Sequence, residues 1–150
     1  MNNTTKLFNI SLTKVLLLIT FSFLLPPSVS AEDGLYERGI TLVEQKDYEK
    51  ALKAFELGAK TGDLNAMTAL GIMYITGVGV IQNDVKGFKY VQDAANKSHP
   101  KAQYTLGAIY YLGAGVSVDF DKAFSWIRLS ADQGYLDAQH NLALMYEAGE

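Results

Sequence analysis

Residues 66–80, AMTALGIMYITGVGV, and residues 102–116, AQYTLGAIYYLGAGV, place the same residue types in the same order 36 positions apart. A third, shorter copy begins at Ala138. The matching columns are Ala66, Ala102 and Ala138; Leu70, Leu106 and Leu142; Tyr74, Tyr110 and Tyr146; and Gly77, Gly113 and Gly149. Chance does not keep this many columns in one register, and a fixed period of this length is the signature of a repeat protein.

Each period has the pattern of two helices joined by a glycine turn. The alanine, leucine and tyrosine columns fall at i, i+4 and i+8, on one face of a helix. Gly77 ends this first helix, because glycine adopts positive φ without a Cβ clash. Asn83 or Asp84 then caps a second helix that runs to about Lys97. Pro100 stands in the first turn of the next helix, where its missing N–H costs nothing.

The first unit is shorter than the others. Lys50 follows Gly39 by 11 positions, whereas Lys86 follows Gly71 by 15. Asp47 still has the position of an N-cap for a second helix, which we expect over residues 48–60. On the second helices, Trp126 aligns with Tyr90 and Ala54, and we interpret it as a residue that packs between repeats.

The first 31 residues have the pattern of a secretory signal peptide. Lys6 and Lys14 are their only charged residues, and residues 15–25, VLLLITFSFLL, form an uncharged apolar run before small residues near Ala31. This run is shorter than the roughly 20 residues of a membrane-spanning helix. We therefore expect cleavage after Ala31, with an uncleaved anchor as the alternative. Cleavage predicts a periplasmic or secreted domain of residues 32–150.

The motif A-x-x-x-L-G-x-x-Y-x-x-G-x-G-V, followed by a capped helix that ends in paired alanines, resembles the Sel-1-like repeat family, which is related to tetratricopeptide repeats. Two nearly full copies carry it: Ala66, Leu70, Gly71, Tyr74, Gly77, Gly79 and Val80, and Ala102, Leu106, Gly107, Tyr110, Gly113, Gly115 and Val116. The resemblance implies an all-α, right-handed α/α solenoid of about three and a half helix pairs. It also implies binding to other proteins and no reaction. The expected units are residues 33–63, 64–99, 100–135 and a partial 136–150.

In such a solenoid the concave face would bind a partner, and it would be lined by the first-helix residues opposite the core. Tyrosine and histidine there are amphipathic and suit protein contacts. The predicted groove is Thr68, Ile72, Ile75, Tyr104, Ala108, Tyr111, His140 and Leu144, with Glu147 on the same stripe. The alternative is that these side chains pack against neighbouring helices.

Charge and composition exclude several other functions. Residues 32–150 carry 11 basic and 16 acidic side chains, which argues against nucleic acid or an anionic membrane as the partner. The chain has no cysteine, so disulfides and cysteine chemistry are absent. His99 and His140 lack the spacing of metal ligands, and we expect both at the surface. Ser98 and Lys101 match S-x-x-K without its partner motifs. We therefore expect no catalytic residue, metal or cofactor.

The sequence thus predicts a non-enzymatic protein–protein interaction or scaffold module of the bacterial envelope or the exterior. Two alternatives remain. Cysteine-rich members of the family, some reported to bind β-lactams, suggest a β-lactam-binding or hydrolysing enzyme, although they use disulfides that this chain lacks. The chain could also be the N-terminal part of a longer secreted solenoid, because its last helix, residues 136–150, has no partner helix in the sequence. That helix could mediate self-association.

Overall fold

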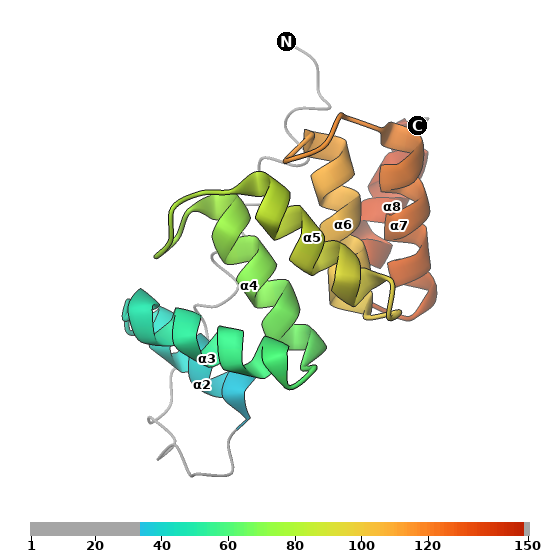
Figure 1. Ribbon diagram of the computed structural model, residues 1–150. Coiled ribbons are helices and arrows are strands. Elements are labelled where there is room, and N and C mark those ends of the chain that lie inside the picture. The colour runs from blue at the N-terminus through green and yellow to red at the C-terminus, as the bar shows by residue number, and fades with distance from the viewer. Residues whose placement is uncertain (1–33, 149–150) are drawn as a thin grey trace.

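Seven α-helices and no strand make up the part of the chain that the computed structural model describes, residues 34–148. They are α2 (Leu35–Glu44), α3 (Tyr48–Lys60), α4 (Leu64–Thr76), α5 (Asp84–Ala95), α6 (Pro100–Leu112), α7 (Phe120–Asp132) and α8 (Leu136–Ala148) (Figure 1). The predicted signal peptide, residues 1–31, lies outside the described residues.

Short polar side chains begin the second helix of each pair, as the sequence predicts. Asp47, Asn83 and Asp119 each accept a hydrogen bond from the backbone N–H three residues later, at 3.3, 2.9 and 2.9 Å. These bonds satisfy an amide that the first turn of a helix leaves unpaired. Asn83 is the cap of α5, and Asp84 is its first residue, so the structure decides between the two candidates. The helix ends at Ala95, slightly before the predicted end.

Glycines set both the ends of the first helices and their distance from the second helices. Gly77 and Gly113 end α4 and α6 with φ of 71° and 74°, the left-handed conformation. Inside α6, a Cβ on Gly107 would lie 2.9 Å from the backbone oxygen of Ala123 in α7. Gly71 has the same relation to Gly87. The paired helices therefore cross with their backbones close together, as the small residues in these columns indicate.

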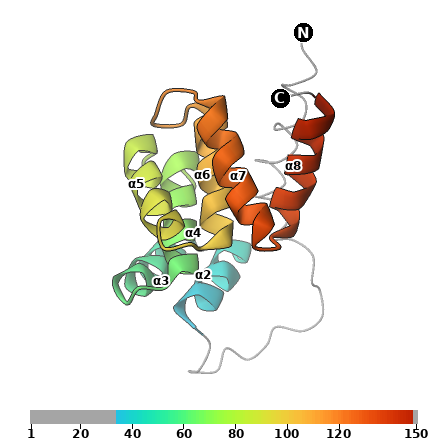
Figure 2. The same cartoon turned by 90° about the vertical axis from the view of Figure 1, so that its right-hand side faces the viewer.

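The pairs stack into one continuous array, an α/α solenoid. Each helix packs on the next, and the first helices α2, α4 and α6 also contact one another in order (Figures 1 and 2). Three apolar clusters follow the stack, around Phe55 and Leu70, around Val91 and Leu106, and around Ile127. Each cluster takes residues from neighbouring pairs, which is how a repeat that cannot bury its own apolar face becomes stable. Trp126 packs against the second cluster, consistent with its predicted place between repeats.

His99 is not the surface residue that the sequence suggested. It is half-buried and caps α6, since its Nδ1 accepts the backbone N–H of Ala102 at 3.3 Å. Nδ1 is also 3.4 Å from the hydroxyl of Thr68, and Nε2 is 3.1 Å from the amide oxygen of Asn65. An accepting Nδ1 requires the proton on Nε2, so the ring is neutral. Burial, with a smaller effect of Lys101, lowers the pKa of His99 below its usual value.

Candidate functional site

The structure divides the predicted groove into buried and accessible residues. Thr68, Tyr104 and Ala108 are buried, whereas His140 and Glu147 are exposed. The other residues of the stripe are partly accessible: Ile72, Ile75, Tyr111 and Leu144. The period in the sequence shows which residues share one face of a helix. Neighbouring helices cover more than that one face, so some residues of the predicted groove are buried as well. Contact of the stripe with a partner stays a prediction, and the three buried side chains act in packing.

Tyr104 shows how a groove candidate is used inside the fold. Its hydroxyl accepts a hydrogen bond from the amide nitrogen of Asn141 in α8 at 2.7 Å. Its ring lies 5.5 Å from the ring of Tyr135, centroid to centroid. Burial, followed by the nearby Asp137 carboxylate, raises the pKa of Tyr135. Tyr104 therefore links α6 to α8 and to the turn before α8.

A different surface is exposed and apolar, at the side of the stack where first helices end and second helices begin. We call it the loop edge. Its members are Ile81 (92% exposed), Val85 (67%), Leu112 (45%), Val118 (51%) and Phe120 (59%). They come from the α4–α5 loop, the α6–α7 loop and the helix turns beside them, along the upper side of the stack in Figure 1. A gathering of exposed apolar side chains marks an interaction surface more often than scattered single ones do.

The two loops of this edge are held against the preceding units. Asn83 N–H donates to the Tyr74 carbonyl at 2.8 Å, and Asp119 N–H donates to the Tyr110 carbonyl at 3.0 Å, so both loops close in the same way. A Cβ on Gly115 would lie 2.6 Å from the backbone of Asp84, which places the second loop directly on the start of α5. The edge is therefore a fixed surface with repeated geometry.

One predicted groove residue borders this surface. The ring of Tyr111 packs edge-on against Phe120, with centroids 5.2 Å apart. The members of the loop edge are not among the predicted groove residues, all of which lie on the first helices. The signal available was the presence of Ile81 and Val118 in loops between glycines and caps, where apolar side chains have no helix face to cover.

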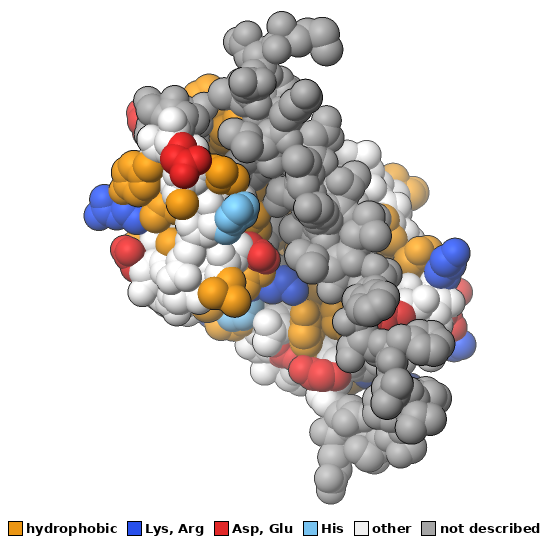
Figure 3. Space-filling view, turned by 180° about the vertical axis from the view of Figure 1, so that it is seen from behind, with side chains coloured by type: hydrophobic (Ala, Val, Ile, Leu, Met, Phe, Trp, Pro, Cys, Tyr) orange, Lys and Arg blue, Asp and Glu red, His pale blue; other side chains and the backbone are white. Residues whose placement is uncertain are grey.

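Other kinds of site find no support among residues 34–148. These residues contain no cluster of three or more histidine, cysteine, aspartate or glutamate side chains that could hold a metal ion. No helix among them is long and apolar enough to cross a membrane. In the view from behind, acidic and basic side chains are scattered over the described surface and form no continuous basic area (Figure 3). The coloured part of this face therefore shows no basic stripe of the kind that a nucleic-acid binder presents.

Stacked helix pairs with a shared core and a fixed 36-residue period define the class of α/α solenoid repeat proteins. Comparison with protein families gives the particular kind. A family model described as "Sel1 repeat" matches residues 33–63, 64–99, 100–135 and 136–150. The chain belongs to the Sel1 repeat family. Sel1 repeats generally serve as protein-interaction modules.

Two solved structures have the same fold. A Sel1 repeat protein from Oxalobacter formigenes is 32% identical, with a TM-score of 0.69 over 76% of this chain and 46% of that one. A protective antigen present in uropathogenic Escherichia coli strains, displaying an SLR fold, is 28% identical, with a TM-score of 0.68 over 77% of this chain and 26% of that one. This chain spans less than half the length of either structure.

Proposed function

We propose that the chain is a non-enzymatic protein-binding module that acts in the bacterial envelope or outside the cell, and that it binds its partner at the loop edge. The loop edge is the observation that carries the proposal. Its apolar side chains are held out to solvent by loops that pack firmly on the units behind them. Such a preformed surface loses little conformational entropy on binding. The predicted signal peptide supports the envelope or exterior setting.

Affinity capture with matched variants tests the binding surface. The bait is the chain purified from its own cells, exposed to envelope and medium fractions. Ile81→Ser with Val118→Ser removes two exposed apolar side chains from the loop edge. We expect the double variant to capture about tenfold less, or still less, of the proteins that the wild type retains. A tenfold decrease corresponds to a loss of about 1.4 kcal/mol of binding free energy.

Leu136→Ser provides the control, because Leu136 is an equally exposed apolar residue away from the loop edge. It should capture the same proteins as the wild type, and all three chains should melt at the same temperature. Equal capture by the wild type and the double variant would reject the loop edge as the binding surface.

The proposed localisation has its own test. N-terminal sequencing of the chain from the periplasm or medium should begin at Glu32, and a chain found only in the cytosol would contradict the proposal.

A further inference from the structure

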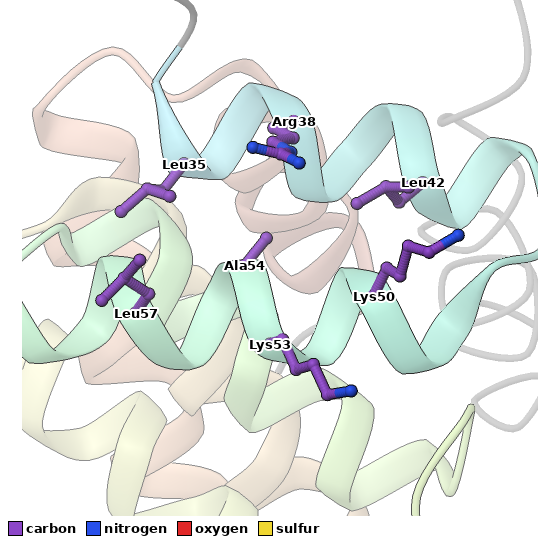
Figure 4. A pocket seen from close by; sticks show the side chains of 7 residues that line it. All are labelled: Leu35, Arg38, Leu42, Lys50, Lys53, Ala54 and Leu57. Atoms are coloured by element: carbon purple, nitrogen blue, oxygen red, sulfur yellow. The ribbon is translucent and has the colours of Figure 1, made fainter. Parts of the chain in front are cut away.

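A hollow lies at the N-terminal end of the described helices, between α2 and α3. Its volume is about 240 Å³, and it opens to solvent. Side chains of both helices form its walls: Leu35, Arg38 and Leu42 from α2, and Lys50, Lys53, Ala54 and Leu57 from α3 (Figure 4). Leu35 and Leu57 lie at one end of the hollow, and Leu42 lies beside Lys50 at the other. Between these ends Arg38 of α2 lies across from Ala54 of α3, and Lys53 extends from α3 on the side away from α2. The loop edge shares none of these residues.

The hollow exists because the first unit has a small residue where the other units have an aromatic ring. Ala54 takes the position of Tyr90 in the second unit and of Trp126 in the third. Tyr90 stacks on Tyr74 with ring centroids 6.0 Å apart and packs against the cluster that α2, α3 and α4 share. Trp126 packs against the cluster of the unit before it. At this position an inner unit fills its contact with the preceding unit by an aromatic side chain.

A second substitution changes the same face from apolar to charged. Arg38 precedes Gly39 as Leu70 precedes Gly71 and Leu106 precedes Gly107. Leu70 and Leu106 are fully buried in the contacts between units, whereas Arg38 is exposed. The first unit therefore does not present the surface on which an ordinary repeat would stack. It presents an open cavity of side-chain size beside a guanidinium.

The charges around the cavity have one sign, although the whole chain is acidic, with a net charge of -3. Lys50 and Lys53 pair with Asp47 and Glu49 at 2.6 and 2.7 Å, but these ion pairs are exposed, and such pairs add little stability. Arg38 forms no ion pair within residues 34–148. Its planar guanidinium is free to bind a carboxylate through two parallel hydrogen bonds.

We propose that this hollow binds an acidic peptide segment of a partner protein, with one large apolar side chain of that segment in the cavity. The side chain takes the place that Tyr90 and Trp126 fill in the inner units, and Leu35, Leu42 and Leu57 surround it. Carboxylates of the peptide on either side of this side chain bind Arg38. They also compete with Asp47 and Glu49 for Lys50 and Lys53. The binding therefore needs both parts of the peptide, the apolar side chain and the flanking negative charge.

Fluorescence anisotropy with a defined probe tests the proposal. The probe is a fluorescein-labelled peptide with one tryptophan between two pairs of glutamates, titrated with the chain as purified from the cell. We expect saturable binding that weakens as salt is added, because salt screens the charge pairs. Replacing the glutamates by glutamines, or the tryptophan by alanine, should weaken binding about tenfold or more.

Three variants place the binding in the hollow. Ala54→Trp fills the cavity as Trp126 does in the third unit, and Arg38→Gln removes the unpaired cation. Each should weaken binding of the probe about tenfold or more. Lys89→Gln is the matched control, because Lys89 holds the position of Lys53 in the second unit and does not line the hollow. It should bind like the wild type.

Two results would overturn the proposal. One is a failed peptide titration, in which the wild type shows no saturable binding or Ala54→Trp and Arg38→Gln both bind the probe as the wild type does. The other is a dimer in sedimentation velocity that Ala54→Trp abolishes, which would make a second copy of the chain the occupant. Loss of probe binding in Ala54→Trp is separable from the loop-edge test, since Ile81→Ser with Val118→Ser should leave probe binding intact.

Discussion

Helices α6 and α8 hold the same place in their repeats, but within residues 34–148 only α6 is followed by the second helix of its own unit, α7. The face that α6 turns to its partner contains Gly107, where the backbone of α7 leaves no room for a Cβ. The corresponding position in α8 is Ala143, which is exposed. The columns that build the core are unchanged, since Ala102 and Ala138 are both fully buried.

This difference teaches that the repeat motif has two separable parts. One set of columns packs each first helix on the unit before it, and α8 keeps this set. The other set of columns contacts the second helix of the same unit. In α8 these positions form a mostly polar and exposed surface, which consists of Gln139, His140, Ala143 and Glu147. Self-association through α8 stays a prediction, and this face offers little apolar area for it.

Adding a methyl group at position 107 and removing one at position 143 gives the largest contrast. Gly107→Ala places a Cβ 2.6 Å from the Ile127 side chain and 2.9 Å from the backbone of Ala123. Because backbone cannot yield as a side chain can, we expect a loss of about 3 kcal/mol in the free energy of unfolding. Ala143→Gly removes a methyl group from an exposed helix position and should cost only about 1 kcal/mol. Urea denaturation measures both, and equal losses would show that α7 does not pack on α6 as described.

The link between the two helices is the next target. Tyr104→Phe removes the hydroxyl that accepts the hydrogen bond of Asn141, while the ring and its packing on Tyr135 remain. We expect a loss of about 1.5 kcal/mol, because the partly buried amide of Asn141 loses its partner. Tyr146→Phe is the control in α8, where the ring is exposed and packs edge-on against Phe124. It should change the free energy of unfolding by less than about 0.5 kcal/mol.

The turns that precede α6 and α8 have a serine and a glycine at the same position, and each residue can be replaced by the other. Ser98 before α6 has φ of 60°, and Gly134 before α8 has φ of 84°, both in the left-handed region. Gly134→Ser should cost about 1 kcal/mol, because a side chain disfavours this conformation even though no atom lies within 4 Å of the new Cβ. Ser98→Gly relieves the same penalty and should stabilise the chain by a few tenths of a kcal/mol, since glycine also gains freedom when unfolded. Thermal melting of both variants compares them, and shifts of equal sign would contradict a shared turn geometry.

Much of this architecture could be predicted from the sequence, because repeats, caps and helix-ending glycines act locally. Asp47, Asn83 and Gly77 fill their roles wherever their helices lie in space. The groove could not be predicted as reliably. The period places Thr68 and Tyr104 on one face, but it does not show which neighbouring helix covers that face. The hollow between α2 and α3 was missed for a related reason: Ala54 was aligned with Tyr90 and Trp126, but a cavity depends on what surrounds the missing ring.

The smallest effect concerns how α6 and α8 begin. His99 caps α6, whereas Tyr135 stands at the same position before α8 and has no charge to gain in acid. The pKa of His99 is lowered in the folded chain, so between that pKa and the unfolded value near 6.5 the unfolded state binds more protons. The stability that the neutral ring contributes is therefore present above about pH 6.5 and is lost as the pH falls through the folded pKa.

His99→Asn keeps a side-chain acceptor at the cap and removes the titration. Between pH 7.5 and pH 5 we expect the wild type to lose more of its free energy of unfolding than this variant, measured by urea denaturation at each pH. The difference is small because the ring is only half-buried and water screens its charge. If His99→Asn follows the wild-type profile, the acid sensitivity arises elsewhere in the fold, and the caps of α6 and α8 respond alike to pH.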